Sequence, residues 1–330
     1  MGAQVSVLTW VSQYPSVLYP GSVQKGSLRF DPEVEPVLHW AKPSTWTAVG
    51  ERARGADLLV IPWVTPFQAM SVRRMVDVAH PTPVVLMVHN VRPHETRLFD
   101  SPITRWGLEG VNAAVVHSRA VATDLSEMMP GIRIRIVGHP PNISHSRTPL
   151  PGYPPIRALF IGNVRHYKGL DIGIRAMAHA RNEGFDIRLT VAGSFWEPIA
   201  KYQRLVRALG LVGVVDLRPG YVTDEELSRL IAEHHFIMAP YRTATQSGIV
   251  PLALTAGRPV IATRVGGLEE VVRDRVDGVL ADATANDIAH AMVEMCNRLP
   301  ELASAAGHWH APRWIDVADA ILTLGTRSQD

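Results

Sequence analysis

The chain has 330 residues, which is enough for two ordinary domains or one large one. Hydrophobic residues make up 46%, charged residues 19%, and the formal net charge is +2. These values exclude a disordered chain and give no reason to expect a nucleic acid or an anionic membrane as partner. The single cysteine, Cys296, excludes an intramolecular disulfide and a cysteine-based zinc site, and we expect it to pack in the core.

No export signal is expected at the start of the chain. Residues 1–8 lack the basic start and the apolar stretch of a signal peptide, and no window of 18 apolar residues occurs anywhere. We therefore expect a cytoplasmic location and no membrane-spanning helix.

Short apolar runs alternate with stretches of helical period along the whole chain. In the first half we predict strands at residues 5–11, 57–63, 83–89, 113–117 and 133–137. In the second half we predict strands at residues 157–162, 187–193, 214–219, 236–239, 259–262 and 278–280. Strands that are apolar on both faces and separated by helices are typical of parallel sheets covered on both sides. The predicted fold is α/β, with two doubly wound, Rossmann-like domains facing a cleft.

A proline-rich segment divides the two halves. Six of the 17 residues from 140 to 156 are proline, which fixes φ and cannot donate to a strand ladder. We predict an N-terminal domain over 1–140, a stiff linker over 141–156, a C-terminal domain over 157–313, and a helix and tail over 314–330.

The run Gly-Asn-Val-Arg-His-Tyr-Lys-Gly at residues 162–169 follows a predicted buried strand and precedes a predicted helix. A glycine turn and a helix N-terminus direct free N–H groups toward an anion. Arg165 and Lys168 add two full charges beside Gly162, so the pattern predicts a phosphate or diphosphate site. Two solvated loop cations are the alternative.

A second strand–loop–helix junction carries Gln246, Ser247 and Gly248. Their N–H groups would lie at the start of a helix, and Gly248 would let an oxygen approach the backbone closely. An ordinary helix start remains the alternative. A third junction, at residues 262–270, contains Gly266 and Gly267 and has the same two readings.

Polar residues also follow two predicted strands of the first half. His89 ends the strand at 83–89 and is followed by Asn90, and His117 ends the strand at 113–117 and is followed by Ser118. Ligands of such sheets bind outside the carboxyl ends of the strands, so both histidines are candidate catalytic residues. The alternative is that they pack in the core. None of the 14 histidines has the spacing of a zinc site, and we expect no metal.

These segments together resemble the phosphate loop and neighbouring motifs of the family-4 retaining glycosyltransferases, which have the GT-B fold. The matching stretches are residues 87–95, 115–118, 160–171, 241–251 and 257–267. The resemblance extends from about residue 10 to 314. It implies an enzyme that transfers a hexosyl group from a UDP- or GDP-sugar to an acceptor hydroxyl, with retention of configuration and without a metal or other cofactor.

The resemblance also implies roles for the candidate residues. Arg165 and Lys168 would neutralise the donor diphosphate, and the amides of residues 246–248 would hold its phosphates and sugar. Tyr221 would lie beside the nucleotide base. His89 and His117 would line the first-domain side of the cleft, near the transferred sugar.

Two features depart from the family pattern. Thr245 and Ala253 stand at the positions of the usual glutamate pair. The chain also begins at the family's second strand, without its first strand, glycine-rich loop and first helix. Two other functions therefore remain open: a catalytically weak protein that binds a nucleotide or glycan, and a sugar-nucleotide epimerase of the same fold.

The expected partners are a nucleotide-sugar donor and a glycan, lipid-linked or small-molecule acceptor, with no nucleic acid. Residues 71–75 and 97–99 are candidates for a peripheral membrane contact.

Overall fold

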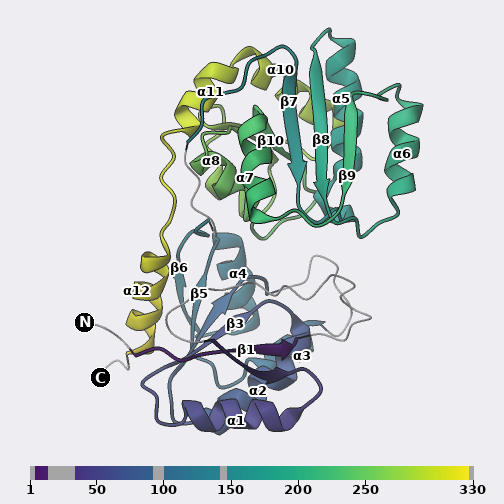
Figure 1. Ribbon diagram of the computed structural model, residues 1–330. Helices are drawn as coiled ribbons and strands as arrows, with labels where there is room; N and C mark the ends of the chain where they lie inside the picture. The colour runs from purple at the N-terminus through teal and green to yellow at the C-terminus, as the bar shows by residue number, and fades with distance from the viewer. Residues whose placement is uncertain (1–3, 14–33, 92–99, 142–146, 327–330) are drawn as a thin grey trace. The chain divides into compact units, whose positions relative to one another are not determined.

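The computed structural model describes residues 4–13, 34–91, 100–141 and 147–326 (Figure 1). Its contacts divide the chain into two compact units. The first contains Met1–Val116, Ala122–Arg135 and Ala318–Asp330, and the second contains His117–Val121 and Ile136–Val317. The boundary between the units therefore lies near residue 136, and the last residues of the chain, from Ala318 onward, belong to the first unit. The sequence predicts a linker at 141–156 and a separate segment from 314.

A parallel sheet with the strand order β12-β11-β10-β7-β8-β9 forms the centre of the second unit. Its strands are β7 (Ile156–Ile161), β8 (Ile187–Gly193), β9 (Val215–Pro219), β10 (Phe236–Ala239), β11 (Val260–Thr263) and β12 (Gly278–Ala281). The order reverses between β7 and β10, which makes this sheet doubly wound. Ligands bind such sheets at the carboxyl edge near the reversal.

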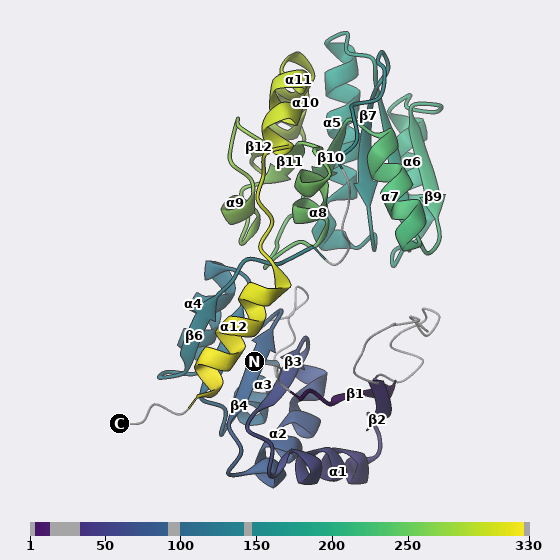
Figure 2. The same cartoon turned by 60° about the vertical axis from the view of Figure 1, so that its left-hand side comes forward.

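Helices cover both faces of this sheet (Figures 1 and 2). One face packs on α5 (Leu170–Asn182), α6 (Ile199–Ala208) and α10 (Ala285–Asn297), and the other on α7 (Asp224–Glu233), α8 (Ile249–Thr255) and α9 (Leu268–Val271). Alternate residues of each strand enter the two cores: Phe160 faces α5, and Leu159 and Ile161 face the opposite side. This two-sided burial explains the continuous apolar runs of the sequence. The helices α11 (Leu299–Ala306) and α12 (Trp314–Gly325) follow.

The first unit contains two parallel sheets among its described residues. One pairs β1 (Val7–Ser12) with β2 (Val34–His39). The other has β3 (Leu59–Trp63), β4 (Val84–Val88), β5 (Ala113–Val116) and β6 (Arg133–Ile136) side by side in chain order. The remaining helices are α1 (Pro43–Ala53), α2 (Ala69–Ala79), α3 (Asp100–Gly107) and α4 (Arg119–Met128), with a 3-10 turn, η1, at Pro66–Gln68. The C-terminal end of α12 packs on this unit, where Arg133 Nη2 donates to Leu324 O at 2.8 Å.

The predicted α/β class with parallel sheets is confirmed, but the sequence analysis missed strand β2. This strand has the sequence Val-Glu-Pro-Val-Leu-His, and a proline inside a short run argues against a strand. Pro36 is tolerated because β2 pairs through one edge with β1 and the register shifts nearby. All the predicted strands occur, and their ends differ from the predicted ones by at most two residues.

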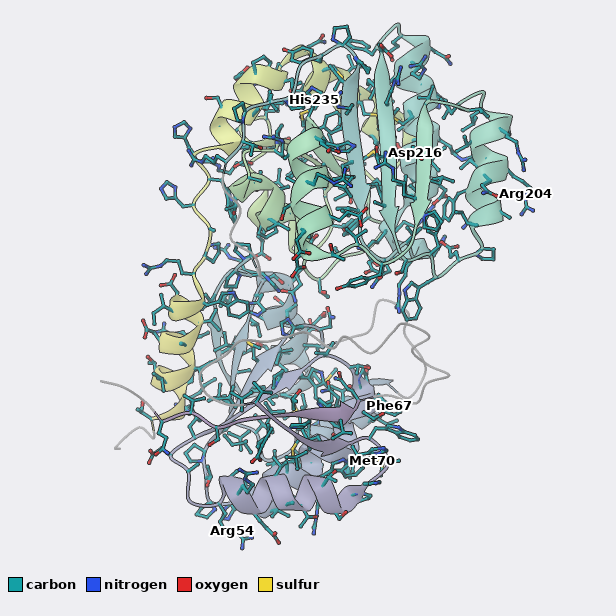
Figure 3. The ribbon with its side chains drawn as sticks, viewed as in Figure 1. Arg54, Phe67, Met70, Arg204, Asp216 and His235 are labelled. Atoms are coloured by element: carbon teal, nitrogen blue, oxygen red, sulfur yellow. The ribbon has the colours of Figure 1, made fainter. Side chains whose placement is uncertain are left out.

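The surface of the first unit carries several exposed apolar side chains. Phe67 and Met70 point outward from η1 and α2 (Figure 3). In the segment 71–75, by contrast, Ser71, Val72 and Met75 are buried, so its apolar side chains belong to the core. The candidate segment 97–99 lies outside the described residues. No described helix has the length and apolar character needed to cross a membrane.

Candidate functional site

Three glycines mark the carboxyl ends of neighbouring strands in the second unit. Gly162, Gly193 and Gly220 follow or end β7, β8 and β9, with φ values of +106°, +144° and +149°. A Cβ on Gly193 would lie 2.0 Å from Gly162 O, so the two backbones approach too closely for any side chain. Gly162 N donates to Ala192 O, and Gly220 N donates to Gly193 O. These bonds hold three strand–loop junctions together at one edge of the sheet.

The loop after β7 places Arg165 over an aromatic ring. Val164 N donates to Ser194 O and Trp196 N donates to Val164 O, so the loops after β7 and β8 run side by side. The guanidinium carbon of Arg165 lies 3.9 Å from the centre of the Trp196 ring. Stacking on a ring orients a guanidinium without neutralising its charge.

Lys168 ends a 3-10 turn, η2 (His166–Lys168), and is half-buried. Its Nζ lies 5.4 Å from the centre of the Tyr241 ring and 3.1 Å from the place that a Cβ on Gly162 would occupy. Within the described part of the chain, neither Lys168 nor Arg165 takes part in an ion pair. The turn therefore presents two positive charges at the carboxyl edge of the sheet, in the place that the sequence predicts.

The same turn is bonded to Arg242, which follows β10. Arg242 Nη1 donates to His166 O at 3.0 Å and to Asp171 Oδ1 at 2.9 Å, and Nη2 donates to Asp171 Oδ2 at 2.6 Å. Burial favours a higher pKa for Asp171, but the hydrogen bonds and charge of Arg242 outweigh it and lower that pKa below its usual value. Asp171 is therefore ionised at neutral pH and is paired with Arg242.

The second predicted anion loop lies against Gly266 and Gly267. A Cβ on Gly266 would lie 1.7 Å from Ala244 O, and one on Gly267 would lie 2.4 Å from Thr245 O. These glycines allow the loop before α8 to pack closely on the loop after β11. This structural need explains why glycines occur at the third junction of the sequence.

In that loop Ser247 is buried, Gln246 is half-buried and Gly248 is exposed. Gly248 has an ordinary φ of −74°, and a Cβ there would meet no atom within 4 Å. The protein itself therefore does not require glycine at this position. Its missing side chain leaves space outside the loop, which is consistent with the expected close approach of a ligand.

Tyr221 follows Gly220 in the loop after β9 and is 60% exposed. Ser194 Oγ donates to Gly220 O at 3.4 Å, so this loop joins the one that carries Trp196. Gly162, Arg165 and Lys168 thus follow β7 and Tyr221 follows β9, two strands further along the same edge of the sheet.

His117 is buried, with 4% of its surface exposed. Its Nδ1 lies 2.9 Å from Val137 O, and its ring centre lies 4.8 Å from that of His139. A carbonyl can only accept, so Nδ1 carries the proton and donates, and Nε2 is the acceptor nitrogen. Burial lowers the pKa of His117 to about 4, so the ring is neutral at pH 7.

Residues 117–121 belong to the same unit as the loop before α8. Ser118, next to His117, donates from Oγ to Thr245 O at 3.0 Å. His89 belongs to the first unit, is half-buried, and donates from its backbone N to Trp63 O. Val88 pairs with Val116 in the sheet. His89 directly follows the first residue of this pair, and His117 directly follows the second.

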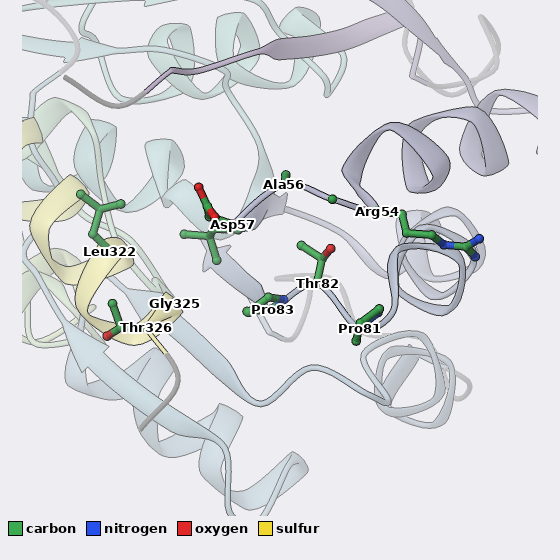
Figure 4. A pocket seen from close by; sticks show the side chains of 11 residues that line it. Arg54, Ala56, Asp57, Pro81, Thr82, Pro83, Leu322, Gly325 and Thr326 are labelled. Carbon is green, nitrogen blue, oxygen red and sulfur yellow. The ribbon is translucent and has the colours of Figure 1, made fainter. Parts of the chain in front are cut away.

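A hollow of about 540 Å³ lies elsewhere in the first unit (Figure 4). It is lined by Asp57, Thr82 and Leu322, among others, at the amino ends of β3 and β4 beside the end of α12. Parallel sheets bind ligands at the other end of the strands. The hollow holds none of the residues predicted for the site.

Sequence reasoning missed Trp196, Arg242 and Asp171. All three lie just after a strand or at the start of a helix, in the zone where site residues of parallel sheets gather. Their position was therefore visible in the sequence. Their contacts were not, because Arg242 and Asp171 are 71 residues apart.

Comparison with known proteins identifies a related segment. Residues 155–298 match the family model described as "Glycosyl transferases group 1". D-inositol 3-phosphate glycosyltransferase of Thermobifida fusca is 30% identical over 235 residues, which cover 64% of this chain and 50% of that protein. D-inositol 3-phosphate glycosyltransferase 1 of Catenulispora acidiphila is 28% identical over 230 residues, covering 66% and 53%. The chain thus spans about half the length of the curated relatives it matches.

Solved structures share the fold. HepE of Anabaena, in complex with UDP, has a TM-score of 0.68 at 14% identity and is covered over 83% of its length by 89% of this chain. Sucrose-phosphate synthase of Thermosynechococcus elongatus has a TM-score of 0.66 at 16% identity, with coverages of 87% of this chain and 75% of that one. The chain therefore has the GT-B fold, and its residues 155–298 match the group 1 glycosyl transferases.

Proposed function

We propose that this protein is a retaining glycosyltransferase, which moves a hexosyl group from a UDP- or GDP-sugar to an acceptor hydroxyl. The observation that carries the proposal is the turn at residues 165–168. It offers two cations at the carboxyl edge of a parallel sheet, and among the described residues no carboxylate pairs with either.

The proposed chemistry follows from the leaving group. As the bond to the sugar breaks, negative charge grows on the diphosphate, and fixed cations and N–H groups stabilise that charge. Arg165 and Lys168 supply the charges, Gly162 leaves space beside the Lys168 ammonium group, and the backbone at residues 246–248 supplies donors. Tyr221 lies beside the base. No side chain has to act as a nucleophile, and we propose that no metal is required.

The histidines have different proposed roles from the cations. His117 is neutral at pH 7, so it acts as an acceptor for a sugar hydroxyl through Nε2 and does not serve as a general acid. His89, which follows the adjacent strand, is proposed to contact the transferred sugar as well.

The relatives indicate which donor and acceptor to test first. UDP-sugars are the first donors to test, because a solved structure of HepE from Anabaena contains UDP-glucose. D-inositol 3-phosphate is the first acceptor to test, because it is in the name of several relatives. GDP-sugars and a set of glycan and lipid-linked acceptors complete the panel.

The test combines binding and turnover. UDP or GDP should raise the unfolding temperature, and the matching sugar nucleotide should be consumed in the presence of EDTA. NMR of the product should show the anomeric configuration of the donor. Inversion would reject the retaining mechanism, and consumption that requires a divalent cation would reject metal independence.

Thr245 and Ala253 keep one alternative open, a glycosyltransferase-like binding protein with weak turnover. Alanine has a methyl side chain, so Ala253, which is also fully buried, offers no polar side-chain group to a sugar. Calorimetric binding of UDP or GDP without consumption of any donor would favour this alternative.

The epimerase alternative predicts an epimerised sugar nucleotide without an acceptor. The cytoplasmic location and the membrane contact stay predictions.

A further inference from the structure

Arg242 links the end of β10 to a segment that lies about 70 residues earlier in the sequence. Its backbone N donates to Tyr167 O at 2.7 Å, and its Nη1 donates to His166 O at 3.0 Å. Its two amino groups also bind both oxygens of Asp171, at 2.9 and 2.6 Å. One residue after β10 thus holds the 3-10 turn η2 and the first turn of α5.

Close packing surrounds these bonds. A Cβ on Gly169 would lie 2.0 Å from Pro240 O, so the backbone after the turn touches the backbone before Arg242. The rings of Tyr167 and Tyr241 meet edge to face, with centres 6.1 Å apart. Because Lys168 lies between Tyr167 and Gly169, these contacts fix its backbone.

Arg242 also neutralises a carboxylate beside the cationic turn. Asp171 follows Lys168 by three residues and lies in the first turn of α5, where an anion would otherwise bind. Its side chain is 23% exposed, and that of Arg242 is 28% exposed, so the pair is only partly screened by water. Without Arg242, the carboxylate would compete with a phosphate for Lys168 and Arg165.

We infer that Arg242 is a positioning residue, which holds the cationic turn in the geometry that a nucleoside diphosphate requires and withdraws Asp171 from it. This inference rests on the proposed function. A diphosphate depends on both cations being correctly placed, whereas a nucleoside monophosphate can bind with one phosphate contact. Arg242 therefore sets the preference for the diphosphate rather than the affinity for the nucleoside.

The experiment measures the dissociation constants of UDP, UMP, GDP and GMP by calorimetry for the wild type and three variants. Arg242→Gln removes the charge and the fork. Arg242→Lys keeps the charge but cannot bind both carboxylate oxygens in a fork. Arg298→Gln is the matched control, because Arg298 lies in the same unit, is 31% exposed and binds Glu294, Glu301 and a backbone carbonyl.

In Arg242→Gln, the Kd of the diphosphate should rise about tenfold, as expected for lost charged hydrogen bonds, and that of the monophosphate less than about threefold. Arg242→Lys should recover part of the diphosphate preference, and Arg298→Gln should keep all of it. The KM for the sugar nucleotide should rise in the same order as the diphosphate Kd.

Equal weakening of diphosphate and monophosphate binding by Arg242→Gln would overturn the inference, as would an equal effect of Arg298→Gln. If Arg242→Gln does not fold, Arg242→Lys decides, because it keeps the charge but loses the fork on Asp171. Arg242→Lys should have a lower diphosphate preference than the wild type, and an unchanged preference would overturn the inference. Failure of the wild type to bind any of the four nucleotides would instead reject the proposed function.

Discussion

Lys168 has its ammonium group near the face of an aromatic ring, Tyr241, and pairs with no carboxylate among the residues that the structure describes. A contact with a ring orients the ammonium group, and an anionic ligand can still bind it. Arg165 is held in the same way, over Trp196. The two cations of the candidate site are therefore each oriented by an aromatic ring.

Lys168→Ala should therefore reduce sugar transfer strongly without unfolding the protein. Removal of one donor to a developing anion costs about a hundredfold in kcat. Steady-state kinetics with the best donor measures the loss, and Arg175→Ala, which removes an exposed cation from the following helix α5, serves as control. Normal turnover by Lys168→Ala would reject the assignment of the phosphate site.

Trp196→Ala should release Arg165 from its fixed orientation. A cation–π contact at a partly exposed site contributes about 0.5–1 kcal/mol, so donor affinity should fall a few-fold. Trp196→Phe keeps a ring and should keep most of the affinity. Identical donor Kd values in the wild type and in Trp196→Ala, measured by calorimetry, would show that the stacking does not matter for binding.

Among the elements, the junctions between strands and helices carry the functional arrangement. Gly169, the N-cap residue of α5, has a φ of +65° and lies against Pro240 O, so the close approach of η2 to the end of β10 depends on a missing side chain. The buried Arg258 makes a comparable connection on the other side of the unit. It donates to Thr148 O and Pro149 O of the proline-rich segment and to Ile231 O in α7.

Gly169→Ala should destabilise the protein more than Gly210→Ala. Both positions have a left-handed φ, +65° and +67°, which costs a residue with a Cβ about 1–2 kcal/mol. At Gly210 a Cβ would meet no atom within 4 Å, whereas at Gly169 it would lie 2.0 Å from a carbonyl oxygen. The difference in unfolding temperature isolates the clash. Equal losses would show that the turn can move away from β10 without cost.

For the molecule as a whole, buried histidines predict sensitivity to acid. Burial lowers the pKa of His235 to about 4, from 6.5, and lowers that of His234 as well. Both follow α7, and His235 accepts from Arg157 N through Nδ1 and donates to Pro151 O through Nε2. Between pH 6.5 and 4 the unfolded chain therefore binds more protons than the folded chain.

The free energy of unfolding should consequently fall as the pH drops from about 6.5 to about 4 and level off below, as far as these histidines determine it. Urea unfolding at a series of pH values measures the slope. His235→Gln should be less stable at pH 7 but show a shallower slope. His290→Gln, which changes an exposed histidine, should keep the slope of the wild type, and a slope unchanged in His235→Gln would contradict the assignment.

The strands were predictable because each is a local pattern. The buried run Ile-Arg-Ala-Leu-Phe-Ile of β7, followed by Gly162, is visible without any partner. β2 was not, because Pro36 breaks its pattern and only pairing with β1 makes it a strand. The turn at 165–168 was placed correctly at a sheet edge, because a strand end and a helix start enclose it.

The amino-acid sequence by itself determined the α/β class, the strand ends and the two cations of the turn, since apolar periodicity and glycine turns act over a few neighbouring residues. Only the tertiary structure decided which groups these cations meet. Trp196 under Arg165, and Asp171 in the fork of Arg242, follow from the order of strands in the sheet. That order depends on packing between segments distant in the chain, which no local pattern records.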